Sequence, residues 1–340
     1  MLRIIQVGVA GYGATWLRTV PLLPERVEYA ALVDVSPDAL TRAREVLGTP
    51  DLPSFDRLES ALAAVEADAV LCVVPPMYHE SVIVPAIEAG LHVLTEKPIA
   101  DSLEACHRIL QASRRGRGVT MVSQKGRYHP WVRLFREIVQ TNGIGALSHL
   151  TYWYKDGRLF WGKFRHELAD ALFVEMSIHH FDLIRAILGR EAVSVWAESW
   201  NPPWSGFKGD IIGFARFRFE GGLPVHYHAN KISRGDLSSW YGDIVAEGEH
   251  ATLTLDYPRL FKTRMGASPT FTRGLQEDLL RAGDPQEGQI VSFTEFLDAI
   301  DEQRSPETSM EDNLKSMAMM FAAIDSAHSG VERKIADYLI

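Results

Sequence analysis

The sequence is poor in cysteine, in basic charge and in long apolar runs. Its 340 residues contain two cysteines, Cys72 and Cys106, which are too few for the disulfide framework of a secreted domain. Both lie in apolar segments and are predicted to be small core residues in a reducing compartment. The formal net charge is −9, which argues against nucleic acid or an anionic membrane as a partner, because both bind basic patches.

Signals for membrane insertion and export are also missing. No apolar run reaches the length of a membrane span, and the N-terminus lacks the charged, apolar and cleavable regions of a signal peptide. We therefore expect a cytoplasmic protein with no membrane partner. Hydrophobic residues make up 46% of the chain, which is ordinary for a globular protein, and the length fits two domains.

The first feature that indicates a function is a strand that ends in glycines. Residues 4–9 form a short apolar run, as in a buried parallel strand. Gly11 and Gly13 then fill the first two places of G-x-G-x-x-G, where glycine permits a tight turn and close approach to a pyrophosphate. The helix that follows would direct its N–H groups at that pyrophosphate. The predicted cofactor contacts in this turn are Gly8, Gly11, Tyr12, Gly13 and Ala14.

The third glycine place is occupied by Trp16. A glycine there lets the helix pack closely on the strand, so a tryptophan predicts looser packing or a ring that points along the cofactor groove. By itself, the glycine turn also fits a tight strand–helix connection that binds no ligand.

A second strand, residues 29–35, strengthens the nucleotide interpretation because Asp34 lies at its end. A carboxylate about 20 residues past the glycines binds the ribose hydroxyls of NAD. It would repel a 2′-phosphate, so NAD is predicted over NADP. The alternative role for Asp34 is a helix cap or a turn residue before Ser36.

Strands and helices alternate up to about residue 123, which predicts an α/β domain with a Rossmann-type, doubly wound parallel sheet over residues 1–124. Residues 125–340 show period-two segments instead, which predict an α+β domain with a large, mostly antiparallel open sheet. Helices should cover one face of that sheet. Aromatics such as Phe214 and Phe217 are expected on the open face, where they would contact a partner subunit in a homodimer or homotetramer. The predicted strands are residues 147–154, 193–200, 211–219, 225–231, 243–247 and 251–256.

Lys97 follows a further predicted strand, residues 91–94. Ligands of open α/β sheets bind beyond the carboxyl ends of the strands, which is where this lysine should lie. Pro98 keeps Lys97 out of the helical region and extended. The alternative is a solvated pair of Glu96 and Lys97 on a loop.

The segment 173–189 has the apolar spacing of a helix, and its polar residues indicate acid–base chemistry. Glu175 and His179 are four residues apart and share a helical face, with Asp182 close to it. A histidine is the natural base for a hydroxyl proton, and a neighbouring carboxylate can orient it. His180 points elsewhere and is expected to pack or cap. A core role for His179 stays open, and no metal is predicted because no third ligand has suitable spacing.

These segments together resemble the glucose–fructose oxidoreductase/inositol dehydrogenase (Gfo/Idh/MocA) family over essentially the whole chain. The resemblance rests on the glycine turn with Asp34, on Pro75-Pro76 with His79, on Glu96-Lys97-Pro98 and on E-M-S-I-H-H-F-D-L-I-R. It implies an N-terminal NAD(P)-binding domain and a second domain whose open sheet builds oligomers. It adds Lys97 to the predicted cofactor site, and three further residues with it. These are Pro75, His79 and Glu96.

The same resemblance places a lysine and a D-x-x-x-H pair beside the reacting carbon of a sugar or polyol. Carried over, the catalytic residues are Lys97, His179 and Glu175, with Glu175 where aspartate is more usual. In the segment S-W-N-P-P-W-S-G, tryptophan rings could face the C–H side of a sugar or anchor the loop. The predicted substrate contacts are Lys97, Tyr154, Arg165, His166, Trp200 and Trp204.

The resulting prediction is an NAD-dependent dehydrogenase for a secondary hydroxyl of a sugar, glycoside or cyclic polyol. Two alternatives stay open. One is an enzyme that cleaves glycosides by transient oxidation with tightly bound NAD. The other is a non-catalytic NAD-binding protein.

Overall fold

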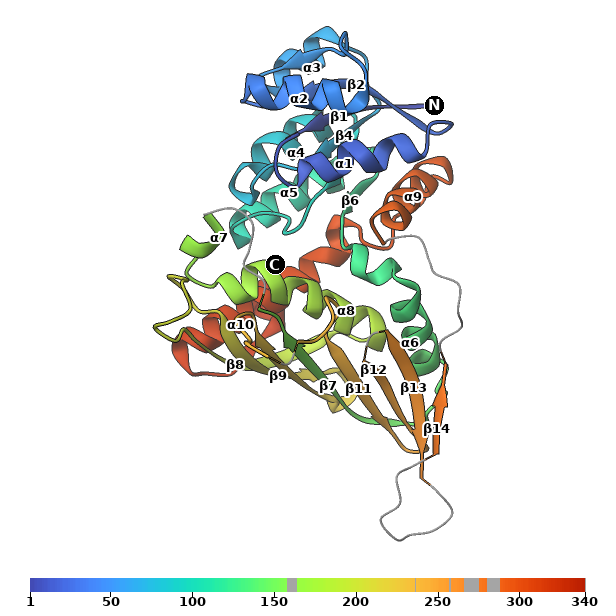
Figure 1. Cartoon of the computed structure of the whole chain (residues 1–340), viewed down its shortest axis with the longest axis vertical. Coiled ribbons are helices and arrows are strands. Elements are labelled where there is room, and N and C mark those ends of the chain that lie inside the picture. The colour runs from blue at the N-terminus through green and yellow to red at the C-terminus, as the bar shows by residue number, and fades with distance from the viewer. Residues whose placement is uncertain (158–163, 236, 257, 266–274, 280–287, 340) are drawn as a thin grey trace. The chain divides into compact units, whose positions relative to one another are not determined.

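The computed structural model describes residues 1–157, 164–235, 237–256, 258–265, 275–279 and 288–339, which form two compact units. The first unit holds the described residues of 1–125 and 286–314. The second unit holds the described residues of 126–285 and 315–340. Figure 1 labels most of the helices and strands of both units.

The first unit contains a six-stranded sheet in the order β3-β2-β1-β4-β5-β6, with every neighbouring pair parallel. This confirms the predicted Rossmann-type α/β fold. The strands are β1 Leu2–Val7, β2 Val27–Val33, β3 Ser54–Phe55, β4 Ala69–Cys72, β5 His92–Thr95 and β6 Thr120–Val122. The helices between them are α1 Gly13–Thr19, α2 Pro37–Leu47, α3 Leu58–Ala64, α4 His79–Glu88 and α5 Leu103–Arg115.

Local sequence explains where these elements lie. Strand β4 is apolar along its whole length and fully buried, because helices cover both faces of a parallel sheet. Serine side chains cap two helices: Ser36 accepts a hydrogen bond from Ala39 N, and Ser102 accepts one from Ala105 N. Gly48, with a φ of +66°, ends α2 in the left-handed conformation.

A helix from much later in the chain, α9 (Gly288–Asp301), also belongs to the first unit. Its Phe293 ring lies edge-on to Trp16 of α1 at 5.7 Å. Arg26 pairs with both Asp298 and Asp301 of the same helix. We did not expect a helix here from the sequence. The predicted domain boundary between residues 124 and 125 stays a prediction. The packing of α9, however, places this helix in the first unit together with residues 1–125.

The second unit contains a nine-stranded sheet in the order β14-β13-β12-β11-β7-β10-β9-β8-β15. The pairing is antiparallel except between β7 and β10, which confirms a large, mostly antiparallel sheet. The strands are β7 Leu147–Lys155, β8 Ala192–Trp200, β9 Ile212–Phe219, β10 Pro224–Asn230, β11 Asp243–Gly248, β12 Thr252–Asp256, β13 Arg259–Arg264, β14 Leu275–Asp278 and β15 Arg333–Lys334.

Helices pack on one face of this sheet, and Figure 1 shows α8 (Ile178–Leu188) lying across it. The ring of Phe181 in α8 contacts Phe217 at 4.8 Å and Tyr227 at 5.0 Å. Phe217 is therefore a core residue, and the expectation that it faces a partner subunit is wrong. Phe214 and Phe217 are three residues apart, so alternation along β9 directs them to opposite faces. Phe214 lies beside Trp196 on the face away from α8.

The remaining helices complete the second unit. A π-helical segment, Leu172–Ser177, leads directly into α8. Among the described residues, no helix combines the length and the apolar character that a membrane crossing requires. The other helices are α6 Pro130–Gln140, α7 Phe164–Glu167 and, from Lys315 onward, α10 Met310–Ser329.

Candidate functional site

The glycine turn after β1 has a shape that only glycine allows. Gly8 has a φ of +89°, and a Cβ on it would lie 2.6 Å from Val73 O. A Cβ on Gly13 would lie 2.3 Å from Gly8 O. Gly11, with a φ of +55°, has no heavy atom within 4 Å of the place where its Cβ would be. The turn is closed on its inner side and open at Gly11, and this open backbone fits the pyrophosphate of a dinucleotide.

Asp34 lies directly after β2 and ties that strand to the glycine turn. Its Oδ2 accepts a hydrogen bond from Val9 N at 3.0 Å, and its Oδ1 accepts one from Ser36 N at 2.9 Å. Ser36 caps α2, so Asp34 is not the helix cap. Each carboxylate oxygen keeps acceptor capacity for a ribose hydroxyl. The residues present therefore fit NAD, which they would hold at the turn and at Asp34.

Replacing Asp34 by serine is expected to narrow the preference for NAD over NADP, because the substitution removes the charge that repels a 2′-phosphate. Dissociation constants for both cofactors, measured by fluorescence titration, test this. The matched control is Asp38→Ser, since Asp38 is an exposed acid in the first turn of α2. Equal or tighter binding of NADP by the unmodified protein would contradict the assignment.

Lys97 follows β5 at the carboxyl edge of the same sheet. A buried histidine holds this loop in place. His79 Nδ1 lies 3.0 Å from Ile99 O, and its Nε2 lies 2.9 Å from Val74 O. The sequence predicts a cofactor contact for His79, whereas the structure places its ring in the interior, between the loops that follow β4 and β5. Burial lowers the pKa of His79.

Three further predicted cofactor contacts lie around this edge of the sheet. Pro75 precedes the 3-10 turn Pro76–Tyr78, and its carbonyl accepts a hydrogen bond from Tyr78 N. Ala14 is in the first turn of α1. The hydroxyl of Tyr12 accepts a hydrogen bond from Lys125 Nζ at 3.0 Å. All three therefore lie at the carboxyl ends of parallel strands, where dinucleotides bind.

Trp16 and Glu96 form a contact that the sequence did not indicate. Trp16 is fully buried, and its Nε1 donates a hydrogen bond to Glu96 Oε1 at 3.0 Å. A fully buried indole does not line an open cofactor groove, and looser packing of α1 stays a prediction. Glu96 Oε2 also accepts a hydrogen bond from Lys97 N at 3.3 Å.

In the second unit, His179 is the second residue of α8, and Glu175 is in the π-helical segment before it. Such segments are frequent at functional sites. Arg165 Nε lies 3.1 Å from Glu175 Oε2, so a predicted substrate contact and a predicted catalytic acid form one ion pair. The ring of Trp240 lies edge-on to His179 at 5.8 Å. We did not predict Trp240 from the sequence, because nothing in its local pattern links it to the helix.

Asp182, which the sequence places close to the face shared by Glu175 and His179, is buried. Its two oxygens accept hydrogen bonds from Arg127 Nε and Nη2, both at 2.6 Å, and Oδ1 accepts another from Ser316. His180 packs in the core as expected, with Nδ1 2.8 Å from Tyr227 Oη. Desolvation lowers the pKa of His180 to about 3, so the ring stays neutral.

Tyr154 was predicted to line the substrate pocket but is fully buried. Its hydroxyl donates a hydrogen bond to Asp156 Oδ2 at 2.9 Å, and Lys231 Nζ donates to the same oxygen at 2.8 Å. Asp156 and Lys231 each keep only 2% of their side-chain surface exposed. The two residues follow the parallel strands β7 and β10, which brings them to the same edge of the sheet.

The other predicted substrate contacts lie on or near the loop after β8. Trp200 and Trp204 are both exposed. The guanidinium of Arg234 lies 5.2 Å from the centre of the Trp204 ring, a cation–π contact. His166 stacks on Phe207 at 4.3 Å. The alternatives of a sugar platform and a loop anchor therefore stay open for Trp200.

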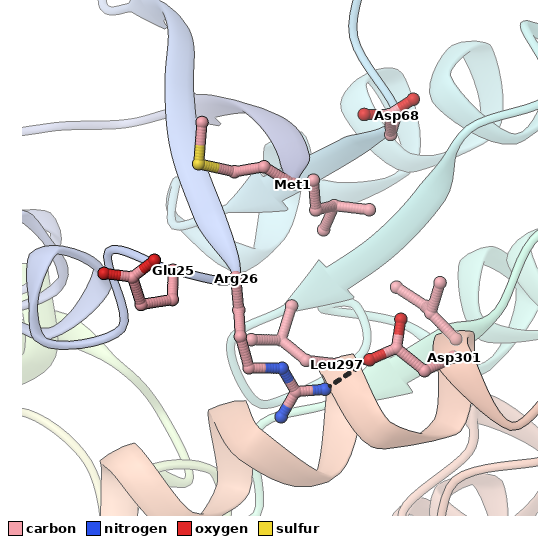
Figure 2. Close-up of a pocket in the computed structure, with 8 residues that line it drawn as sticks. Met1, Glu25, Arg26, Asp68, Leu297 and Asp301 are labelled. Carbon is pink, nitrogen blue, oxygen red and sulfur yellow. Dashed lines mark hydrogen bonds and ion pairs between the residues drawn. The ribbon is translucent and has the colours of Figure 1, made fainter.

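Neither a metal cluster nor the hollow drawn in Figure 2 adds to this site. In the part of the chain that the structure describes, no group of three or more His, Cys, Asp or Glu side chains could hold a metal ion. The hollow lies where β1 and β2 begin, whereas cofactors of such sheets bind where the strands end. Its lining residues are Met1, Leu2, Glu25, Arg26, Asp68, Leu297, Ile300 and Asp301.

Sequence comparison identifies both halves of the chain. The pattern described as "Oxidoreductase family, NAD-binding Rossmann fold" matches residues 2–124, and the pattern of the "GFO/IDH/MocA C-terminal domain" matches residues 132–254. The chain belongs to the Gfo/Idh/MocA family. It is an oxidoreductase of this family with an NAD-binding Rossmann domain, as the sequence predicted.

Three comparisons illustrate the relationship. The uncharacterized protein y4oX of Sinorhizobium fredii is 30% identical over 99% of this chain and 96% of its own length. An inositol 2-dehydrogenase of Corynebacterium glutamicum is 31% identical over 68% of each chain. An oxidoreductase from Agrobacterium radiobacter, solved with NAD+, L-tartaric acid and magnesium, has the same fold, with a TM-score of 0.86 at 18% identity over 99% of each chain.

Proposed function

We propose that this Gfo/Idh/MocA protein oxidises a secondary hydroxyl of a sugar, glycoside or cyclic polyol with NAD. The observation that carries the proposal is Lys97, held at the carboxyl edge of an NAD-binding sheet by backbone contacts of His79 and Glu96. The similarity to an inositol 2-dehydrogenase supports a ring-shaped polyol as substrate. When bound, NAD supplies the hydride acceptor.

We assign two residues to the hydroxyl that reacts, as the family resemblance implies. His179 takes the hydroxyl proton as general base. Lys97 donates a hydrogen bond to the same oxygen and stabilises the negative charge that develops on it. Glu175, which is paired with Arg165, is the neighbouring carboxylate that we propose orients His179.

Trp240 supports a substrate with an apolar ring face. Its ring lies beside His179, and the residue keeps 37% of its surface exposed. Aromatic rings offer flat apolar surfaces against which the C–H side of a sugar or inositol packs. We therefore add Trp240 to Arg165, His166, Trp200 and Trp204 as substrate contacts.

A panel of sugars, glycosides and inositols with NAD, followed by NADH absorbance, tests the proposed function. Stoichiometric NADH formation with a ring polyol supports it. Glycoside cleavage without net NADH would favour the enzyme with tightly bound NAD, and NAD binding without any turnover would favour a non-catalytic protein.

We also propose a homodimer or homotetramer in the cytoplasm. The face of the second sheet away from α8 carries aromatic and histidine pairs, among them Trp153 with His228 and Trp196 with Phe214. Exposed apolar surface of this kind is usually an interface. The free, buried thiols of Cys72 and Cys106 fit a reducing compartment. A monomer by light scattering at micromolar concentration would contradict the oligomer.

A further inference from the structure

We propose that Trp16 and Glu96 act as a positioning pair for Lys97. The tryptophan in the third glycine place holds Glu96, and Glu96 in turn holds Lys97. The role in catalysis rests on the proposed function, whereas the pair itself rests on the contacts of the first unit. Neither residue touches the reacting atoms in this proposal. Both act through the backbone and charge of Lys97.

The contact geometry connects three elements. Trp16 Nε1, from α1, donates to Glu96 Oε1 at 3.0 Å, and Lys97 N donates to Glu96 Oε2 at 3.3 Å. The two carboxylate oxygens of Glu96 thus face α1 on one side and the backbone of Lys97 on the other. A glycine in the third place would provide no side-chain donor to Glu96.

Helix α9 keeps the indole in this orientation. Phe293 lies edge-on to the Trp16 ring at 5.7 Å and 79°. Gln289 Nε2 lies 3.3 Å from Thr15 Oγ1, and its Oε1 lies 3.4 Å from Tyr12 Oη. Since both contacts reach residues of the glycine turn and of α1, α9 fixes the helix that carries Trp16.

The charges around Glu96 give the pair a measurable signature. Burial raises the pKa of Glu96, and the positive charges of Lys125 and Lys97 and the Trp16 N–H oppose that rise. The buried thiol of Cys72 also interacts electrostatically with Glu96, and burial raises its own pKa to about 12, so it stays neutral at ordinary pH. A bond to the carboxylate favours its charged form. Removing the indole N–H should therefore raise the pKa of Glu96 further.

Trp16→Phe deletes the donor and keeps an aromatic ring in the core. Loss of a hydrogen bond to a charged group should lower kcat about tenfold, while the affinity for NAD stays close to normal because the glycine turn and Asp34 are unchanged. Glu96→Gln should have a similar effect, and the two substitutions together should cost little more than either alone. Trp131→Phe is the matched control, since it removes an indole N–H from α6 in the second unit.

Nuclear magnetic resonance of the indole N–H groups tests the pair independently of any activity. The resonance missing in Trp16→Phe identifies Trp16, and it should shift with pH as Glu96 titrates. In Glu96→Gln the shift with pH should disappear. If the Trp16 resonance ignores pH, or titrates equally in Glu96→Gln, the pair does not exist. A titrating pair with additive or absent effects on kcat would overturn its positioning role, and a titrating pair in a protein without turnover would overturn the proposed function alone.

Discussion

Replacing His179 by alanine is expected to lower kcat for oxidation by about 10²–10⁴-fold, the usual contribution of a general base. A protonated imidazole cannot accept the hydroxyl proton, and histidine ordinarily titrates within the physiological range. The unmodified enzyme should therefore lose activity as pH falls through that range. His179→Ala should lose this acid limb along with most of its rate.

Measurements of kcat against pH and of NAD affinity check this prediction. His179 lies outside the NAD-binding unit, so NAD should bind with unchanged affinity. His250→Ala is a suitable control, because His250 is an exposed histidine between β11 and β12. If His179→Ala keeps a near-normal kcat with the acid limb intact, the base is misassigned and Lys97 becomes the leading candidate.

Lys97→Ala is expected to reduce kcat by a hundredfold or more, since a donor aimed at developing charge is typically worth on the order of 3 kcal/mol. Lys97→Met keeps most of the side-chain length without the charge, so it should be almost as slow. Both variants should still bind NAD. Lys97 and His179 are proposed to act on one oxygen. The kcat of the double variant should therefore be higher than the value obtained by multiplying the two single losses. Independent, multiplicative losses would separate the two roles.

The regular parts of the fold could be predicted because their signals are local. Uninterrupted apolar runs identified the buried parallel strands, and period-two runs identified the second sheet. The spacing of Phe293, Phe296 and Leu297 is also helical, so α9 could have been predicted from the sequence, although we did not predict it. Nothing in that spacing states that the helix packs on Trp16, because the two segments lie far apart in the sequence.

The sequence predicted which residues belong to the candidate site, but it predicted only some of the contacts that they make. Asp182 has the right spacing to approach His179, but Arg127 offers it a bidentate pair in the core, which is stronger than a contact with an imidazole. Tyr154 lies at the end of a predicted strand, where its ring was expected to line the substrate pocket. Its hydroxyl instead donates a hydrogen bond to Asp156, which is buried and paired with Lys231. Such partners come from distant segments, and only tertiary structure shows them.

The assignment of α9 to the first unit limits how this protein can be cut or recombined. A fragment that ends at Lys125 would leave the buried edge of Trp16 without Phe293 and would leave Arg26 without its two acids. It would also lose the bond from Val122 N to Thr308 O at the edge of the sheet. We therefore expect that residues 1–125 do not fold stably as a separate NAD-binding domain. A chimaera between relatives has to exchange two separate stretches of the gene together, and a truncated clone of the first stretch should be prone to aggregation.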